Sequence, residues 1–178
     1  MLTRYHRMRM STPLARSRHW AAPALPAGSS LHPWDAALLA EHAHVLAAGF
    51  AEAIDGVLFP NLTTRIGATT LLQDVTACGG FCPGATWLIR ADGEPVAAIQ
   101  GMVLSGGIGL VHNLAVVPAA RGRGFAAVLL RQMLLAYRQL GLRRCELDVT
   151  EENTPAVRLY RRFGFKNVNS RSLMLHTV

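Results

Sequence analysis

A glycine-rich turn is predicted in the stretch Val116-Val117-Pro118-Ala119-Ala120-Arg121-Gly122-Arg123-Gly124-Phe125-Ala126-Ala127. Residues 108–117 alternate as a strand does, and residues 124–140 repeat their polar positions every seven residues, as a helix does. Small residues at such a strand-to-helix turn leave backbone N–H groups free at a helix N-terminus, where phosphate oxygens can bind. Arg121 and Arg123 add positive charge there. We therefore expect a phosphate-bearing ligand at this turn.

Two other interpretations of the same turn are open. Gly122-x-Gly124-x-x-Ala127 fits the glycine pattern of dinucleotide-binding folds, with Glu146 and Asp148 about 20 residues further on. In that pattern the first glycine follows its strand directly, whereas residues 118–121 intervene here, and too little chain follows the helix for a doubly wound sheet. Alternatively, the glycines serve only to pack the helix on the sheet.

A longer pattern resembles the GNAT superfamily of acyl-CoA-dependent N-acetyltransferases. Arg121-x-x-Gly124-x-Ala126 is similar to its Q/R-x-x-G-x-G/A signature, and the likeness extends over residues 110–166. It includes Asn153-x-x-Ala156-x-x-x-Tyr160 and Arg162-Phe163-Gly164-Phe165. Upstream of Thr86 only the order of elements is similar. The resemblance implies a single α/β domain, with a mixed, mostly antiparallel central sheet flanked by helices.

The resemblance also implies where coenzyme A binds. Its pyrophosphate would lie on the backbone amides of the turn, which belong to Arg121, Gly122, Arg123, Gly124, Phe125 and Ala126. Leu114 and Val116 would offer main-chain groups to the pantetheine arm, and the Leu114 amide would polarise the thioester carbonyl. Asn153 matches the residue that contacts this arm. Acetyl-CoA is thus the expected cosubstrate. No metal is expected, because Cys78 and Cys82 lack further ligands at a zinc-like spacing.

Two side chains are candidates for proton transfer. Tyr160 matches the tyrosine that protonates the departing thiolate, a role that a phenol held within hydrogen-bond reach can fill. Some family members carry a glutamate as general base where this chain has Leu110. Strand alternation would place Leu110, His112, Leu114 and Val116 on one face, so we expect His112 to point toward the acyl site and act as the base. Asp148 is a weaker candidate.

The acceptor would enter on the side formed by the first two helices and their loop. This region contains Glu52, Asp55, Phe59 and Asn61. Residues 35–117 carry two arginines against seven acidic residues, whereas residues 118–178 carry eleven basic residues against four acidic ones. Carboxylates beside a basic coenzyme segment suit a cationic amine, although a solvated helix end explains them equally well.

The N-terminal segment is expected to be a strand and a linker. The first 34 residues carry five arginines and no acidic residue, as mitochondrial transit segments do, but residues 5–10 alternate as a short edge strand would. We therefore expect an N-terminal strand and proline-bearing linker over residues 1–29 and a GNAT-like acetyltransferase domain over residues 30–178.

Turn residues and periodicity predict the remaining elements. Helices are expected over residues 36–50, capped by Asp35, and over residues 64–77, with a loop at residues 55–62 between them. A hairpin joins residues 86–90 to residues 95–104. A strand over residues 144–149 precedes a helix that Asn153 or Thr154 caps, and two short strands follow at residues 165–168 and 172–176.

Composition limits the class of protein. The chain is 51% hydrophobic and contains no apolar run long enough for a membrane span, so we expect no membrane association. Three cysteines are too few for a disulfide framework and indicate a reducing, cytoplasmic location. The net charge of +7 makes nucleic acid a candidate partner, but the arginines of the last predicted helix resemble a solvated face, so nucleic acid is the weaker choice.

The function implied by the resemblance is transfer of an acetyl group from acetyl-CoA to a primary amine, by direct attack in a ternary complex. The enzyme would be a monomer or a homodimer. Leu110 in place of a carboxylate leaves open a non-catalytic acyl-CoA-binding regulator on the same fold. The basic charge leaves open, as a lesser alternative, an RNA- or ribosome-associated protein.

Overall fold

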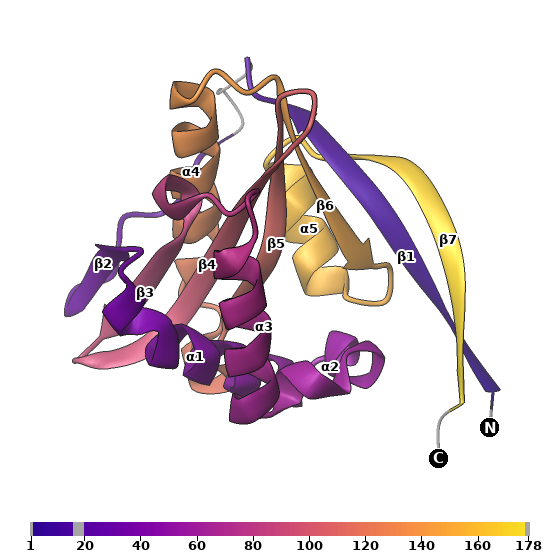
Figure 1. The fold of residues 1–178 in the computed structure, drawn as a ribbon, viewed down its shortest axis with the longest axis horizontal. Helices are drawn as coiled ribbons and strands as arrows, with labels where there is room; N and C mark the ends of the chain where they lie inside the picture. Colours follow the sequence, from indigo (N-terminus) through magenta and orange to yellow (C-terminus); the bar gives the residue numbers. More distant parts are fainter. Residues whose placement is uncertain (1, 16–19, 177–178) are drawn as a thin grey trace.

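The computed structural model describes residues 2–15 and 20–176, which form one mixed sheet with helices on both faces (Figure 1). The strand order is β2-β3-β4-β5-β6-β1-β7. The strands are β1 (Leu2–Pro13), β2 (Ser29–Pro33), β3 (Trp87–Ala91), β4 (Glu94–Leu104), β5 (Ile108–Val116), β6 (Arg144–Thr150) and β7 (Lys166–His176). The helices are α1 (Leu39–Ala51), α2 (Ile54–Leu58), α3 (Arg65–Ala77), α4 (Phe125–Gln139) and α5 (Thr154–Arg162). This architecture confirms the expected fold class.

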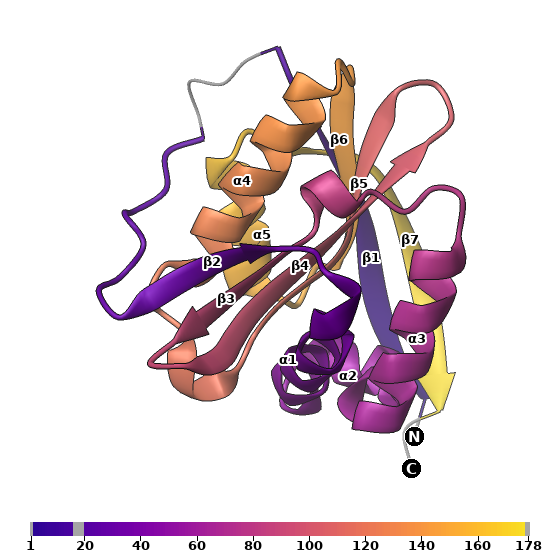
Figure 2. The same ribbon diagram turned by 60° about the vertical axis from the view of Figure 1, so that its left-hand side comes forward.

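Two hydrophobic clusters hold the layers together. The larger cluster joins α4 and α5 to one face of the sheet, and the smaller one joins α1 and α3 to the other face (Figure 2). Leu129, Leu130 and Phe163 are buried in the first, and Leu46 and Leu72 in the second. None of the helices within the described ranges is long and apolar enough to cross a bilayer.

The centre of the sheet opens between β5 and β6. These strands run parallel and pair only where Ile108–Leu110 meets Arg144–Glu146, whereas β5 pairs with β4 from Ile108 to Val116 with one register shift. Among the described strands every other pairing is antiparallel. Beyond Leu110 the two strands diverge, so the following part of β5 has no partner on its β6 side among the strands that the structure describes (Figure 1). A ligand can therefore reach the backbone of β5 from this gap.

The N-terminal strand is not at the sheet edge, so that expectation is wrong. β1 lies between β6 and β7 and pairs antiparallel with both, with Arg7 opposite Thr150 of β6. Met8 and Met10 are buried in the larger cluster. An alternating pattern indicates a strand with one buried face but does not reveal whether one or both backbone edges are paired. β1 thus adds a strand to the sheet formed by the rest of the chain.

Two further sequence predictions are corrected. The segments at residues 165–168 and 172–176 belong to a single strand, β7, in which a register shift skips Val168 and interrupts the alternation. The expected loop at residues 55–62 contains the short helix α2 and a 3₁₀ turn over Pro60–Thr63. The other helices and the hairpin are confirmed within a few residues of their expected bounds, and Asp35 caps a 3₁₀ turn, Ala36–Leu38, that leads into α1.

A buried histidine on α1 makes stability depend on pH. His42 is fully buried, its ring lies 5.0 Å from that of Trp34, and its Nδ1 lies 2.8 Å from the Gln100 amide nitrogen. Burial lowers the pKa of His42 from its ordinary value of 6.5 to about 4. Because the unfolded chain binds this proton at a higher pH than the folded chain does, stability must fall as pH drops below about 6.5.

We expect His42→Gln to flatten this pH dependence. Between pH 7 and pH 4.5 the wild-type chain should lose roughly 2 to 3 kcal/mol of unfolding free energy through His42 alone, and the variant, whose amide does not titrate, should lose that much less. Urea denaturation at the two pH values measures the difference. Equal losses in the two proteins would show that His42 does not resist protonation.

Candidate active site

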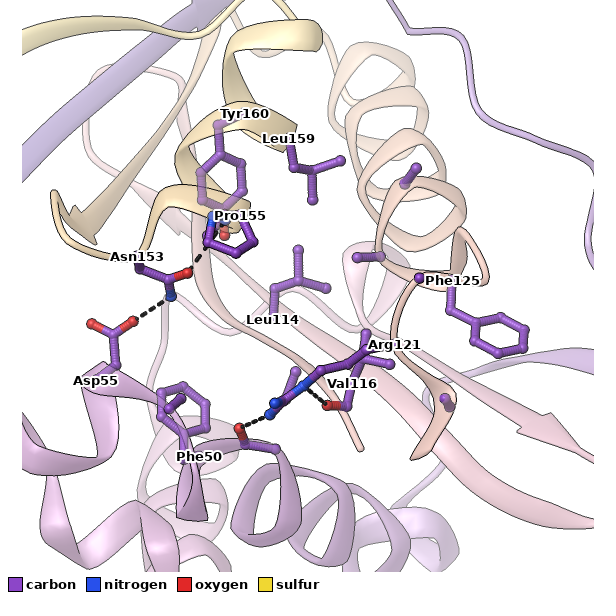
Figure 3. A pocket seen from close by; sticks show the side chains of 18 of the residues that line it. Phe50, Asp55, Leu114, Val116, Arg121, Phe125, Asn153, Pro155, Leu159 and Tyr160 are labelled. Carbon is purple, nitrogen blue, oxygen red and sulfur yellow. Dashed lines mark hydrogen bonds between the residues drawn. The ribbon is translucent and has the colours of Figure 1, made fainter. Parts of the chain in front are cut away.

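Two cavities open into the gap between β5 and β6 and meet at its centre. The first has a volume of about 600 Å³ and is bordered by the glycine turn, the first turns of α5 and the end of α1. The second, of about 790 Å³, is bordered by α2, α3 and the facing parts of β5 and β6. The residues common to both cavities are Phe50, Asp55, Leu114, Asn153, Ala156 and Tyr160. Figure 3 shows all of them except Ala156 with labels, in a view of one pocket.

The glycine turn presents free backbone donors to the first cavity. Gly122 and Gly124 have φ angles of +78° and +87°, which glycine adopts without strain. None of the described backbone carbonyls accepts from the amides of Gly122, Arg123, Gly124, Phe125 and Ala126, which precede or begin α4. The Arg121 amide differs from this expectation, because it already donates to the Pro118 carbonyl at 3.2 Å.

The Arg121 side chain is exposed but is held at the wall of the first cavity by two hydrogen bonds. Its Nη2 donates to the Gly49 carbonyl at 2.9 Å, and its Nε donates to the Val116 carbonyl at 3.4 Å (Figure 3). The guanidinium thereby joins the end of α1 to the end of β5 and keeps its charge at the cavity wall. The Arg123 guanidinium lies 5.0 Å from the centre of the Phe125 ring, whose side chain is buried.

Alternate residues of β5 direct their main-chain groups into the gap. The Val117 amide donates to the Val96 carbonyl of β4. Because successive residues of a strand direct their amides to opposite edges, the N–H and C=O groups of Leu114 and Val116 point toward the gap. Both residues line the first cavity. An extended ligand arm can pair with them as an additional strand.

A β-bulge interrupts β5 at His112. Gln100 pairs with Asn113 but Gly101 pairs with Val111, so His112 is an extra residue with no partner across the ladder. The predicted alternation from Leu110 to Val116 is therefore wrong, and Val111 joins the same core cluster as Leu114. His112 nevertheless lines the second cavity, and its Nε2 is buried without a partner among the described residues. Burial lowers the pKa of His112.

Asn153 and Tyr160 lie where the two cavities meet. The Asn153 Oδ1 accepts from the Ala156 amide at 3.3 Å and caps α5, and its Nδ2 donates to the Asp55 carboxylate at 2.8 Å (Figure 3). Tyr160, two turns into α5, is 8% exposed. Burial, followed by the negative charge of Asp55, raises the pKa of Tyr160. Its hydroxyl therefore stays protonated at neutral pH.

The residues expected to bind the acceptor do not lie together in one cavity. Glu52 lines the first cavity, whereas Phe59 and Asn61 line the second. Asp55 lines both, but its charge is already paired with Arg7 of β1, whose Nη1 lies 2.9 Å from the Asp55 Oδ1. The Arg7 guanidinium also lies 5.2 Å from the centre of the Phe59 ring. A free acidic site for an amine is thus not formed by Asp55.

Arg7 is a site residue that the sequence did not reveal. Its place in the second cavity depends on β1 lying inside the sheet, which the alternation of residues 5–10 does not indicate. Asp148, the weaker candidate base, lines the same cavity but forms two bonds of 3.0 Å with Arg9. This hydrogen-bonded arginine lowers the pKa of Asp148, so the carboxylate is a poor proton acceptor at neutral pH.

Within residues 2–15 and 20–176, no three His, Cys, Asp or Glu side chains gather where they could hold a metal ion. The described site combines the free amides of the turn, the gap-facing edge of β5 and two cavities, with Arg121 in the wall of the first and Arg7 in the wall of the second. The sheet is thus split between β5 and β6, and the glycine turn with its free amides lies beside the opening.

A model of the acetyltransferase (GNAT) family matches residues 65–165, more than half of the chain. The chain therefore belongs to the acetyltransferase (GNAT) family. A curated relative, a mycothiol acetyltransferase of Beutenbergia cavernae, is 32% identical over 152 residues, which are 83% of this chain and 48% of the relative. The chain thus spans about half of that relative's length. A streptothricin acetyltransferase of Streptomyces lavendulae is 38% identical over 55 residues, 31% of this chain and 29% of the relative.

Solved structures share the fold. A GCN5-related N-acetyltransferase from Sphaerobacter thermophilus superposes with a TM-score of 0.70 at 24% identity, covering 96% of this chain and 50% of that one. At this identity the likeness concerns the fold alone.

Proposed function

We propose that this domain transfers an acetyl group from acetyl-CoA to a primary amine by direct attack in a ternary complex. The observation that carries the proposal is the meeting of two cavities at Leu114 and Tyr160, one bordered by the free amides of the turn and one open to a second ligand. Family membership supports the acyl donor, and the second cavity supports an acceptor that is bound at the same time.

The residues of the first cavity suit acetyl-CoA. The amides of Gly122 to Ala126 and the N-terminus of α4 would hold the pyrophosphate, with the Arg121 charge nearby. The pantetheine arm would pair with Leu114 and Val116 in the gap. The thioester carbonyl would then accept from the Leu114 amide, a donor worth about 3 kcal/mol when it is aimed at the developing oxyanion.

Proton transfers complete the reaction. The amine nitrogen attacks the thioester carbon, the C–S bond breaks, and the departing sulfur takes a proton from the Tyr160 hydroxyl. As the bond breaks, the acylated nitrogen gives up its remaining extra proton, which returns through water to the Tyr160 oxygen and leaves a neutral amide. The attacking nitrogen must first lose a proton. We propose that His112 accepts it, directly or through water, because burial keeps the imidazole neutral at pH 7 and its ring lines the acceptor cavity.

The names of the relatives do not agree on one acceptor, since one relative is named for mycothiol and another for streptothricin. Glu52 and Phe59, which lie in different cavities, become candidate contacts for opposite ends of an acceptor that reaches from one cavity to the other. The acidic charge of residues 35–117 supports a cationic amine.

Calorimetry and a thiol-release assay test the proposal. The protein should bind acetyl-CoA and release free CoA thiol with at least one member of a panel of amino sugars, aminoacyl compounds and polyamines. A protein that binds no acetyl-CoA would contradict the proposal. Tight binding without thiol release across the whole panel would instead support an acyl-CoA-binding regulator, the alternative for which Leu110, in place of a carboxylate, is the specific observation.

A further inference from the structure

A buried network links the N-terminal strand to the helix that carries Tyr160. The Arg7 Nη1 donates to the Asp55 Oδ1 and to the Thr150 Oγ1, each at 2.9 Å, and its Nη2 donates to the Asp148 carbonyl at 3.2 Å. The Thr150 hydroxyl donates to the same Asp55 oxygen. The side chains of Arg7 and Asp55 are only 10% and 12% exposed. The arginine is thus held by β6 as well as by its counter-ion.

The second Asp55 oxygen is used differently. The Oδ2 accepts from the Asn153 Nδ2 at 2.8 Å, while the Oδ1 of Asn153 accepts from the Ala156 amide. Asp55 therefore orients the side chain that caps α5, about two turns before Tyr160 (Figure 3). A carboxylate accepting charge-assisted bonds from two sides is held in one geometry.

We propose that Asp55 is a positioning residue, with Arg7 of β1 as its counter-ion. The pair holds Asn153 and the first turn of α5 at the junction of the two cavities, which keeps Tyr160 in place for the proposed acetyl transfer. This inference rests on the proposed function. It makes the N-terminal strand part of the proposed active site. It also gives Asp55 the role of orienting the first turn of α5, in place of the expected role of binding the acceptor.

If the Arg7–Asp55 ion pair only stabilised the fold, its removal would change stability but not the reaction rate. Removing one member of a buried pair leaves an unpaired charge and destabilises the fold, whereas removing both members is often nearly neutral for stability. Stability alone therefore does not reveal positioning. Positioning is tested by changing the atom at residue 55 that faces Asn153, in proteins from which the charges of both Arg7 and Asp55 have been removed.

The experiment compares Arg7→Met/Asp55→Asn with Arg7→Met/Asp55→Leu. Both lack the buried charges, but only the Asn side chain keeps an oxygen that can accept from Asn153. We expect the Leu double variant to show a kcat at least about tenfold lower than the Asn double variant, and acetyl-CoA binding weaker by a similar factor. Thermal melting should show both double variants folded. Arg90→Met, which breaks the ion pair with Glu41 at residues that line neither cavity, is the matched control.

Asn153→Ser provides a second approach that leaves the ion pair intact. Serine can still cap α5 but cannot reach Asp55 with an amide N–H. It should lower kcat in the wild-type background and have little further effect in the Leu double variant. Equal kcat and equal acetyl-CoA affinity in the two double variants would overturn the positioning role. A wild-type protein that binds no acetyl-CoA would instead overturn the proposed function, so the two failures are distinguishable.

Discussion

Gly124→Glu is expected to abolish acetyl-CoA binding. Gly124 adopts a φ of +87° at the N-cap of α4, a conformation in which a side chain adds about 1 to 2 kcal/mol of strain. A Cβ atom there would also collide with the Pro23 ring of the linker. The new carboxylate would stand beside the amides proposed for the pyrophosphate and repel it. Together these effects should weaken binding at least about 1,000-fold, measured by calorimetry.

Gly141→Glu is the matched control. This glycine follows the opposite end of α4, has a φ of +73°, and has open space around its added Cβ. It therefore introduces the same charge and a similar backbone strain away from both cavities. The control should bind acetyl-CoA like the wild type. If Gly124→Glu folds and binds equally well, the turn does not hold the coenzyme.

Tyr160→Phe is expected to slow the reaction without weakening acetyl-CoA binding. The change removes only the hydroxyl and leaves the ring in place, 5.7 Å from that of Phe165. Without a proton donor for the departing thiolate, kcat should fall about 100-fold, since positioned acids contribute roughly 10² to 10⁴. Stopped assays of thiol release at saturating substrates give kcat, and calorimetry gives the affinity.

Tyr137→Phe is the control variant, because it removes a buried tyrosine hydroxyl that has no proposed role in the reaction. The Tyr137 oxygen lies 2.7 Å from the Leu110 carbonyl and 2.9 Å from the Met102 carbonyl, where it joins β4 to β5, and Tyr137 itself lines neither cavity. Its removal should lower the free energy of unfolding by about 1 to 3 kcal/mol and leave kcat within about threefold of wild type. An unchanged kcat in Tyr160→Phe would contradict the acid role.

The parts of the site that could be predicted from sequence are those set by local geometry. A turn that requires positive φ at two positions needs glycine there, so Gly122 and Gly124 were recognisable in the chain. Asn153 at the start of α5 follows the preference of helix caps, and Tyr160 falls on the buried face of that helix. Each of these depends on neighbours within a few residues.

The bulge at His112 could not be predicted, because it depends on how β4 and β5 align. A single extra residue in one strand moves every following side chain to the opposite face of the sheet. No residue type near His112 indicates where such an extra residue occurs. The contacts of the Arg121 side chain could not be predicted from the sequence either. Its bonds to Gly49 and Val116 depend on the distance between α1 and β5, which only packing determines.

The amino-acid sequence by itself determined the turn, the cap and the tyrosine, because short-range sterics and hydrogen bonding restrict which residues can stand there. The tertiary structure alone decided that β1 lies between β6 and β7, and hence that Arg7 meets Asp55 across 48 positions of chain. Alternation specifies which face of a strand is buried but not which strands lie beside it. Those neighbours follow from the packing of the whole sheet.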